Sequence, residues 1–501
     1  MVKLRKKIIV VGAGVGGLAT AIRLQSKGYE VEIFEKESMV GGKMHQIEGN
    51  GFKFDLGPTI VMMPQIYNEV FEIAGKDPKD YIPMENLDPV YSLTFDDGKR
   101  VSVSTDLVKL TKFLEEISYE EAQGYMSYLA DVYKRYLVAK DHFIEKSFRG
   151  PKDFYNPKTL RQALKLKTFD SAYHSISKYV KDDKLRKLLS FQTLYIGISP
   201  YNGPSIYTII PMIEMVYGVW FIKGGMYTMA KSMEKLFIEL GGKINLNSSI
   251  DEIVIEDGKA VGIKLNSKEI KADSIVCNAD FPYAMKNLIK EEKYKGKYTD
   301  KKIDKMKYSC SCFLMYLGLK EKLEDFEVHN IFFAKDFDKN ISDIFDGILP
   351  DDPSIYLYLP TKVDASLAPE GKECLYVLVP IPELSRDKIV WNDETIANYR
   401  SKILDIIKDK TKIDNFEDLI EFERIVTPKD FEGRFNAYNG ATFGLAPTLF
   451  QSNYYRPHNK ASHCENLYFV GSSVHPGAGV PIVLTSAKLT ANEVMKDDGI
   501  I

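Results

Sequence analysis

Residues 8–17 have the sequence IIVVGAGVGG, in which a short apolar run is followed by four glycines. The run at residues 8–11 is typical of a buried parallel strand, and residues 18–27 predict a helix that Gly28 ends. A second apolar run at residues 31–35 predicts another strand. Strand, glycine turn, helix and strand in this order predict a βαβ unit at the start of a doubly wound α/β fold.

The glycines satisfy the pattern G-x-G-x-x-G, which binds dinucleotides when it lies between a strand and a helix. The first glycine permits a tight turn, the second lets the backbone approach a pyrophosphate, and the third allows close helix packing. The helix N-terminus adds unpaired N–H groups. Glu35, about 20 residues further on, places a carboxylate where it accepts ribose hydroxyls and repels a 2'-phosphate. The residues expected to hold this half of the cofactor are Gly12, Ala13, Gly14, Gly16, Gly17, Glu35 and Lys36.

Two further glycine clusters bear on the identity of the dinucleotide, because the fingerprint alone fits FAD and NAD. Gly41-Gly42-Lys43 offers flexible backbone and a cation near the same pyrophosphate. Residues 471–481 (GSSVHPGAGVP) lead into a helix whose N-terminus would favour an anionic reduced flavin. Since the chain has one dinucleotide fingerprint, we expect one tightly held FAD and an electron acceptor without a Rossmann module of its own.

The composition is that of an ordinary folded protein. Its 501 residues predict two or three domains, and 45% hydrophobic with 27% charged residues argues against disorder. A net charge of -3 leaves no overall field that would recruit nucleic acid. Five cysteines are too few, and odd in number, for a disulfide framework, which fits a reducing cytoplasm. No apolar run reaches the roughly 20 residues that span a bilayer.

Beyond the βαβ unit, the pattern of apolar residues changes along the chain. Residues 107–189 predict a largely helical region. Residues 243–278 predict a small antiparallel meander, with Asp257-Gly258 as a hairpin turn. The C-terminus predicts a strand and a last helix from about Pro481. The runs that predict a second sheet are 312–317, 355–359 and 375–379, and the last strand is predicted at 467–470.

Five stretches carry a resemblance to a known family. They are FDLGPTIVMMP (54–64), FQTLYIGISP (191–200), PMIEMVYGVWFIKGGMY (211–227), LAPTLFQSNYYRP (445–457) and LYFVGSSVHPGAGVPIVLTSAK (467–488). On these stretches the chain resembles, nearly end to end, the bacterial phytoene-desaturase-type carotenoid desaturases, most closely the thirty-carbon branch that acts on diapophytoene (dehydrosqualene). The last stretch is the most specific, and the first is shared more loosely with other flavin amine-oxidase-like proteins.

The resemblance implies an α/β architecture in which an FAD-binding, Rossmann-like domain of the amine-oxidase type carries an inserted α+β substrate domain. The FAD-binding domain would comprise residues 1–95, 222–295 and 455–501. The substrate domain would comprise a helical, membrane-associating part at residues 96–221 and a sheet part at residues 296–454.

The resemblance also implies which residues meet FAD away from the fingerprint. Lys43 would lie near the pyrophosphate, where related flavoproteins often carry Arg. The backbone of Val254 would meet the adenine, and Ser472 replaces a smaller residue of the family signature. The other residues expected to contact FAD are Gly42, Gly57, Pro58, Thr59, Gly471, Gly479 and Val480.

The implied reaction is stepwise desaturation of diapophytoene to diaponeurosporene or diapolycopene, with hydride transfer to flavin N5. Positive charge at an allylic carbon spreads over the chain, so a strong base is not obligatory. The histidines show no triad or metal-ligand spacing, and we expect no metal. No catalytic residue is assigned, but two side chains are candidates. Glu214 is a lone carboxylate in an apolar stretch, with a head facing solvent or a cation as the alternative; His475, inside the flavin motif, favours an orienting role over proton transfer.

The substrate is a lipid, which loses roughly 20 kcal/mol or more on entering water at about 0.8 kcal/mol per carbon. The protein must therefore meet a bilayer. Residues 205–222 are apolar but broken by Pro211, Glu214 and Gly218, which suits an interfacial or tunnel-lining helix, or else a buried core helix. Residues 140–167 carry eight Lys or Arg against three Asp or Glu, which suits an anionic lipid surface, or else a solvated helical face. The aromatic residues interleaved there are Phe143, Phe148, Phe154 and Tyr155.

We therefore expect a cytoplasmic protein that associates peripherally with the membrane and passes electrons to a quinone or oxygen. No oligomeric state is predicted. Two other functions stay open on the same fold. One is a carotenoid isomerase or a terminal-methyl oxygenase acting on a chain that is already desaturated. The other is a non-catalytic flavin-binding protein that presents a lipid to partners.

Overall fold

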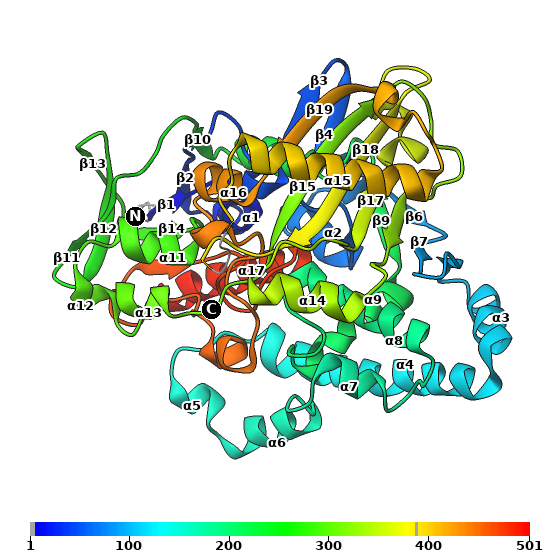
Figure 1. Cartoon of the computed structure of the whole chain (residues 1–501). Helices are drawn as coiled ribbons and strands as arrows, with labels where there is room; N and C mark the ends of the chain where they lie inside the picture. The colour runs from blue at the N-terminus through cyan, green and yellow to red at the C-terminus, as the bar shows by residue number, and fades with distance from the viewer. Residues whose placement is uncertain (1–5, 386–388) are drawn as a thin grey trace.

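A five-stranded parallel sheet collects strands from both ends and the middle of the chain (Figure 1). In the computed structural model, which describes residues 6–385 and 389–501, the strand order is β10-β2-β1-β14-β20. Residues 1–5 and 386–388 lie outside the described residues. They belong to the expected FAD-binding segment 1–95 and to the expected sheet segment 296–454. The strands are β1 (Lys7–Val11), β2 (Glu30–Phe34), β10 (Lys243–Asn245), β14 (Ser274–Cys277) and β20 (Leu467–Phe469).

Side chains of β1 enter two different cores, because successive strand residues point to opposite faces. Ile8 and Val10 pack with helices α1, α10 and α17. Ile9 and Val11 pack with the antiparallel meander β11-β12-β13. Both faces of the sheet are therefore covered, as parallel sheets require. The covering elements are α1 (Val15–Gln25), α10 (Tyr227–Glu239), α17 (Val480–Asp497), β11 (Glu252–Glu256), β12 (Lys259–Leu265) and β13 (Lys268–Lys271).

The predicted βαβ unit and hairpin are both present. Helix α1 begins at Val15, earlier than expected, because the fingerprint glycines form its first turn and Gly14 is its N-cap. Asp257 and Gly258 turn the chain between β11 and β12 with φ angles of 47° and 81°, as a two-residue hairpin loop requires. Helix α17 begins at Val480 and confirms the predicted C-terminal helix.

The predicted second sheet is a mixed sheet of seven strands in the order β19-β15-β18-β17-β16-β7-β8. Its strand β15 (Ser311–Leu319) is buried along its whole length. Phe313 and Met315 pack beneath α15 (Asp393–Thr411), which lies across the sheet in Figure 1, whereas Cys312 and Leu314 face a cavity. The other strands are β7 (Tyr91–Thr94), β8 (Arg100–Val103), β16 (His329–Phe332), β17 (Ile355–Tyr358), β18 (Glu373–Ile381) and β19 (Ile420–Val426).

The region after β8 forms the predicted helical part, which lies along the lower side of Figure 1. Pro157 occupies the first position of α6, where its missing N–H is not needed. Asn156 caps this helix by accepting the Thr159 N–H at 2.9 Å. The helices are α3 (Leu107–Ile117), α4 (Tyr119–Ala139), the π-helical η3 (Lys140–Ile144), α5 (Pro151–Phe154), α6 (Pro157–Lys165), α7 (Ala172–Ile176) and α8 (Asp183–Ser190).

The apolar stretch 205–222 is helical over only part of its length. Helix α9 (Ile209–Tyr217) ends at Gly218, whose φ is 74°, and β9 (Val219–Ile222) follows. The expectation of one helix is therefore wrong for the last residues, because Gly218 ends α9 and the β-branched and aromatic side chains after it complete a small sheet. The partners of β9 are β5 (Val61–Met62) and β6 (Met84–Leu87).

The sheets cross two of the expected domain boundaries. Strands β7 and β8 pair with each other on either side of residue 95, and β9 spans residues 221 and 222. Both strands of the first pair belong to the seven-stranded sheet. The remaining elements include β3 (Gln46–Gly49), β4 (Phe52–Asp55), α2 (Pro64–Glu72), α11 (Phe281–Tyr283), α12 (Glu292–Lys295), α13 (Asp300–Asp304), α14 (Phe337–Asp346) and α16 (Pro428–Phe435).

Two further expectations concerned disulfide bonds and membrane-spanning helices. All five cysteines are buried, and none is joined in a disulfide. Within residues 6–385 and 389–501, no helix combines the length and apolar character needed to cross a bilayer.

Candidate active site

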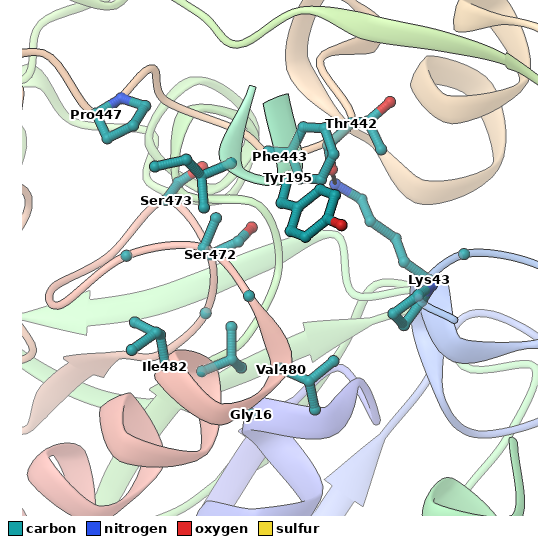
Figure 2. A pocket seen from close by; sticks show the side chains of 18 of the residues that line it. Gly16, Lys43, Tyr195, Thr442, Phe443, Pro447, Ser472, Ser473, Val480 and Ile482 are labelled. Carbon is teal, nitrogen blue, oxygen red and sulfur yellow. Dashed lines mark hydrogen bonds between the residues drawn. The ribbon is translucent and has the colours of Figure 1, made fainter. Parts of the chain in front are cut away.

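A cavity of about 650 Å³ is lined by residues of both large sheets and the helical region. This volume is typical of a small-molecule or cofactor site. One end is lined mainly by glycine-rich turns, and the rest mainly by apolar side chains. Figure 2 shows residues from both ends of the cavity. Gly16 and Val480 come from the glycine-rich turns, and Tyr195 and Phe443 lie across from them.

Glu35 is fixed at the glycine-rich end. It is buried directly after β2, and its carboxylate accepts the Ala13 N–H at 2.6 Å and the Glu37 N–H at 2.9 Å. Burial raises the pKa of Glu35, and the two backbone donors oppose that shift. A carboxylate held in this way keeps lone pairs free for further hydroxyl donors.

The fingerprint glycines keep space open at the N-terminus of α1. A Cβ atom at Gly14 would lie 2.7 Å from Asn278 Oδ1, and one at Gly17 would overlap the Gly12 carbonyl oxygen. No side chain caps α1, so its first N–H groups are available to an anion. Asn278 cannot move freely, because its Nδ2 donates to the Val470 carbonyl at 3.0 Å. These residues fit the pyrophosphate of a dinucleotide.

Lys43 places a cation inside the cavity. Its ammonium donates to the Thr442 carbonyl at 2.8 Å, and Figure 2 shows the Lys43 side chain on the right, running up toward Thr442. Burial lowers the pKa of Lys43, and the charge of Asp280 opposes that shift. Asp280 in turn accepts the Ser473 hydroxyl at 2.8 Å. The cation is thus tied to the segment before α17, which also lines the cavity.

The C-terminal turn is supported by a buried arginine that the sequence did not single out. Gly471, Ser472, Gly479 and Val480 line the cavity at the N-terminus of α17. Arg456 is 1% exposed and donates to backbone carbonyls of this turn and of the preceding loop. The acceptors are the carbonyl oxygens of Leu445, Gln451, Ser472 and Val474. Arg456 belongs to the stretch 445–457, where the only sequence signal was the family resemblance.

The structure brings most of the predicted cofactor residues to one cavity. Three of them do not line it: Ala13, Gly17 and Val254. Ala13 supports Glu35 instead, and Gly17 packs against Gly12. Val254 pairs with Gly262 within the meander, whereas residues 248–250, just before β11, reach the cavity. The residues that do line it are Gly12, Gly14, Gly16, Glu35, Lys36, Gly42, Lys43, Gly57, Pro58, Thr59, Gly471, Ser472, Gly479 and Val480.

His475 lies behind the C-terminal turn and does not line the cavity. It is fully enclosed, and its Nε2 is 3.0 Å from the Lys146 carbonyl. Burial lowers the pKa of His475 to about 3, so the ring is neutral at physiological pH. Its ring also meets Phe148 edge-on with centroids 5.1 Å apart. This position suits orientation of the turn rather than proton transfer.

Glu214 is buried on α9, behind the apolar wall of the cavity. It is 0% exposed and accepts hydrogen bonds from Tyr91 Oη at 3.2 Å and Gln192 Nε2 at 3.0 Å. Burial raises the pKa of Glu214 to about 7. The alternative of a head that faces solvent or a cation is wrong, because α9 directs this side chain into the core and none of the described residues forms an ion pair with it.

The apolar walls come mainly from α9, the seven-stranded sheet and the segment after α4. The N-terminal half of the stretch 205–222 therefore lines the cavity, as one of its two interpretations predicted. Sequence reasoning missed the side chains that come from the sheet, such as Tyr356 and Tyr376. Apolar lining residues include Ile206, Ile209, Ile210, Ile213, Ile331, Phe333, Ile355 and Leu378.

The basic segment 140–167 faces in two directions. Phe143 and Phe148 are buried, so they do not form an outer surface as expected; they pack with Leu166 in a small core of their own. Leu160 and Leu164, one turn apart on α6, are 44% and 70% exposed. We call the exposed residues Tyr155, Lys158, Leu160, Arg161, Leu164 and Lys165 the α6 patch. Ala163, on the same helix, lines the cavity.

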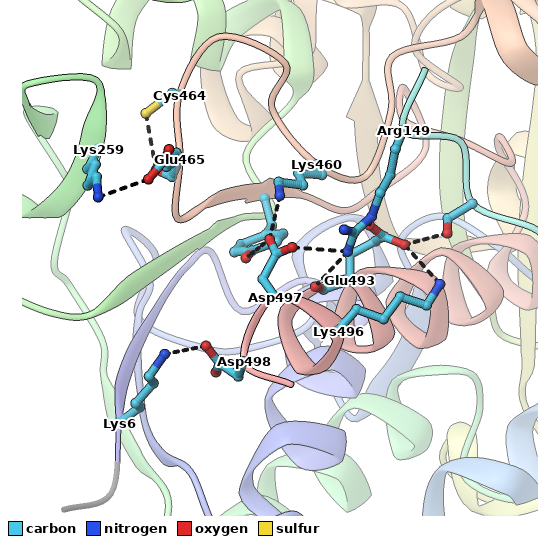
Figure 3. Close-up of polar contacts among 12 residues, drawn as sticks. Lys6, Arg149, Lys259, Lys460, Cys464, Glu465, Glu493, Lys496, Asp497 and Asp498 are labelled. Carbon is cyan, nitrogen blue, oxygen red and sulfur yellow. Dashed lines mark hydrogen bonds and ion pairs between the residues drawn. The ribbon is translucent and has the colours of Figure 1, made fainter. Parts of the chain in front are cut away.

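An ion-pair network fastens this segment to the last helix (Figure 3). Arg149 pairs with Glu493 and Asp497 of α17. Glu493 is 1% exposed and also pairs with Lys496. Because α17 borders the cavity at its N-terminus, the helical region and the glycine-rich turns are held in one arrangement.

Comparison with known proteins agrees with this geometry. The model of the flavin-containing amine oxidoreductase family matches residues 15–495. The chain is 50% identical over 497 residues to the 4,4'-diapophytoene desaturase (4,4'-diaponeurosporene-forming) of Staphylococcus haemolyticus, covering 98% of this chain and 99% of that protein. The corresponding enzyme of Staphylococcus aureus is 49% identical over 498 residues, with 98% of this chain and 99% of that protein covered.

Solved structures show the same fold at low sequence identity. An oxidoreductase from Methanosarcina mazei superimposes with a TM-score of 0.63 at 17% identity, covering 98% of this chain and all of that one. Cyclohexylamine oxidase from Brevibacterium oxydans has a TM-score of 0.59 at 12% identity, covering 99% and 100%. The expected amine-oxidase-type α/β fold and FAD as cofactor are confirmed. The chain therefore belongs to the flavin-containing amine oxidoreductases, as a member of the 4,4'-diapophytoene desaturase family.

Proposed function

We propose that the protein desaturates the thirty-carbon diapophytoene to conjugated diapocarotenes such as diaponeurosporene. The observation that carries this proposal is the single cavity in which a glycine-rich dinucleotide cradle continues into a long apolar compartment. A saturated hydrocarbon segment offers no polar handle, so positioning along apolar walls is what this chain contributes to the reaction.

The residues that would hold FAD are those at the glycine-rich end. Glu35 would accept the ribose hydroxyls, the N-terminus of α1 would hold the pyrophosphate, and residues 57–59 with the turn before α17 would flank the flavin. FAD supplies a hydride acceptor when bound. Arg456 and His475 keep the C-terminal turn in place. We keep the five-segment division of the chain as a proposal, with its first boundary moved ahead of β7 and its second moved out of β9.

The α6 patch would meet the membrane. It combines exposed leucines with three exposed cations, and Ala163 of the same helix borders the cavity. Such a surface inserts apolar side chains between headgroups while its cations meet anionic lipids. A substrate that enters at this point passes from acyl chains to apolar walls without crossing water. Electrons would leave the reduced cofactor to oxygen or a membrane quinone.

Coexpression in a colourless bacterial host tests the function. Cells that carry this chain and a synthase of diapophytoene should accumulate coloured, conjugated thirty-carbon polyenes, identified by mass and absorption. Cells with the synthase alone should accumulate only the colourless precursor. Colourless cells that contain the folded flavoprotein would contradict the proposal, and an aldehyde or a changed geometric isomer from a supplied polyene would favour the oxygenase or isomerase instead.

A further inference from the structure

Glu214 has one carboxylate oxygen without a partner. Oε2 accepts from Tyr91 and Gln192, whereas the buried Oε1 has no hydrogen-bond partner within residues 6–385 and 389–501. A buried polar atom left unpaired costs free energy, so it calls for an explanation. Its neighbour on α9, Ile213, lines the cavity, which puts Glu214 one layer behind the apolar wall.

Tyr195 connects this carboxyl group to the cavity. It lies on η4 (Phe191–Ile196) and lines the cavity (Figure 2). Its buried hydroxyl has no hydrogen-bond partner among the described residues. Gln192, three residues before Tyr195 on η4, donates to Glu214 Oε2 at 3.0 Å, so η4 brings Tyr195 close to the same carboxyl group. Burial, and next the charge of Glu214, raises the pKa of Tyr195 well above its usual range. Two orphaned atoms, one acceptor and one donor, thus lie near each other at the wall.

Tyr195 is also near the segment that we propose flanks the flavin. Tyr356 lines the same cavity as Tyr195, and the Tyr356 hydroxyl is 2.7 Å from Thr59 Oγ1. Tyr376 donates to the Gly57 carbonyl at 3.3 Å. The wall in front of Glu214 therefore belongs to the part of the cavity where residues 57–59 meet the apolar compartment.

Among the residues that the structure describes, no charged side chain forms a hydrogen bond or ion pair with Glu214. The groups that face it are Tyr91 from β7, Tyr125 and Tyr128 from α4, and Gln192 and Tyr195 from η4. Burial raises the pKa of each of these tyrosines, so all stay neutral at physiological pH. Glu214 is the one member of this group that changes charge near neutrality.

We propose that Glu214 accepts, through the Tyr195 hydroxyl, the proton that leaves the substrate during desaturation. This inference rests on the proposed function. Bound FAD would supply the acceptor for one substrate hydrogen and its electron pair, and the adjacent carbon would lose a proton. The electron pair of that second C–H bond becomes the new C=C bond. The Tyr195 oxygen takes the proton while its own O–H proton passes to Glu214 Oε1, so Tyr195 stays neutral and Glu214 becomes a carboxylic acid.

The carboxyl groups that line the cavity are less suited to this task, and one of them, Glu37, forms ion pairs with Lys36 and Arg434. Glu35 is held by two backbone N–H groups at the dinucleotide end, and Asp280 accepts the Ser473 hydroxyl and faces Lys43. Proton transfer is most effective when the acceptor's pKa lies near the working pH. Glu214 meets that condition and lies beside the apolar compartment.

Glu214→Gln tests the proposal, because it keeps the shape of the side chain but cannot accept a proton. Single-turnover reduction of bound flavin by diapophytoene in vesicles is followed at several pH values. In the wild-type protein, the rate constant should fall about tenfold per pH unit below about 7, since protonated Glu214 accepts nothing. In Glu214→Gln it should fall about 10²-fold or more and lose this pH dependence. Tyr195→Phe should slow reduction without losing flavin.

Glu373→Gln is a matched control. Glu373 is also 0% exposed, also has one unpartnered oxygen, and burial also raises its pKa to about 7, but it does not line the cavity or contact Tyr195. This variant should reduce its flavin at the wild-type rate. An infrared titration of glutamate-labelled protein should show two carboxyl bands with apparent pKa values near 7, one from Glu214 and one from Glu373. The Glu214 band is the one that disappears in Glu214→Gln and persists in Glu373→Gln. The band should shift when squalane, a saturated thirty-carbon isoprenoid, occupies the cavity.

Three results would overturn the inference. If Glu214→Gln keeps its full flavin content and reduces the flavin at the wild-type rate with the wild-type pH profile, Glu214 is not the proton acceptor. That result would leave the proposed function intact. If the carboxyl band of Glu214 does not shift when squalane is added, Glu214 is too far from the substrate to accept its proton. If diapophytoene never reduces the flavin of the wild-type protein, the proposed function is wrong, and so is this inference.

Discussion

A methyl group added at Gly17 should weaken FAD binding more than it weakens the fold elsewhere. The Cβ of Gly17→Ala would approach the Gly12 carbonyl oxygen more than 1 Å closer than an ordinary contact at 3.4 Å. The obstructing atom is backbone in the tight turn after β1, so rotation of a side chain cannot relieve the overlap. Overpacking of this kind costs about 1–3 kcal/mol.

The cost should appear mainly as lost affinity, because the free protein can relax by opening the turn whereas the bound cofactor needs it closed. A loss of about 1–3 kcal/mol corresponds to a dissociation constant about 5- to 150-fold higher. Titration of apoprotein with FAD, followed by flavin fluorescence, measures it. Gly433→Ala is the control: nothing lies within 4 Å of its Cβ position in α16, so it should leave affinity unchanged. Equal FAD affinity in Gly17→Ala and wild type would contradict the claim that the tight glycine turn before α1 holds FAD.

Three further changes test other parts of the site. Leu160→Glu with Leu164→Glu should lower binding to anionic vesicles at least tenfold, since each leucine contributes about 1.5–3 kcal/mol when buried in lipid; sedimentation with vesicles measures it. Lys43→Met should raise the FAD dissociation constant about tenfold or more, because charge-assisted hydrogen bonds contribute about 1.5–3 kcal/mol; flavin release on dilution measures it. Arg149→Met should lower the unfolding free energy by about 1–2 kcal/mol, since it removes one partner of the buried Glu493; urea denaturation measures it.

Each change has its own control. Ile238→Glu places the same charge on α10, at a residue 56% exposed and outside the cavity lining, and should keep wild-type vesicle binding. If the two α6 leucines can be replaced with no effect on vesicle binding, the α6 patch is not the docking surface. Lys43→Arg should retain most of the FAD affinity lost in Lys43→Met. An unchanged urea midpoint for Arg149→Met would mean that Lys496 and Ser147 together satisfy Glu493.

The local part of the fold was accessible from sequence. Strand β1, the fingerprint turn and α1 are specified within residues 7–25, because the apolar run, the glycines and the helix pattern are contiguous. The Asp257-Gly258 hairpin is equally local. The secondary structure of residues 205–222 was harder to predict, because the apolar run has no clear period. Gly218 alone marks the change from helix to strand.

The rest of the site depends on contacts between distant segments. Arg456, Tyr195 and Tyr356 come from parts of the chain that meet only after both sheets have formed, and nothing in the local pattern distinguishes them from ordinary core residues. The same holds for Glu214, whose apolar sequence surroundings indicated burial but not the pairing with Gln192 and Tyr91.

The central claim is that both ends of the chain enclose one flavin that faces an apolar compartment. Anaerobic addition of diapophytoene to the purified protein tests it most directly. The account predicts one FAD per chain, loss of the oxidised flavin absorption on addition of substrate, and one new carbon–carbon double bond per flavin reduced. Protein that binds FAD but keeps it fully oxidised with diapophytoene present would contradict it.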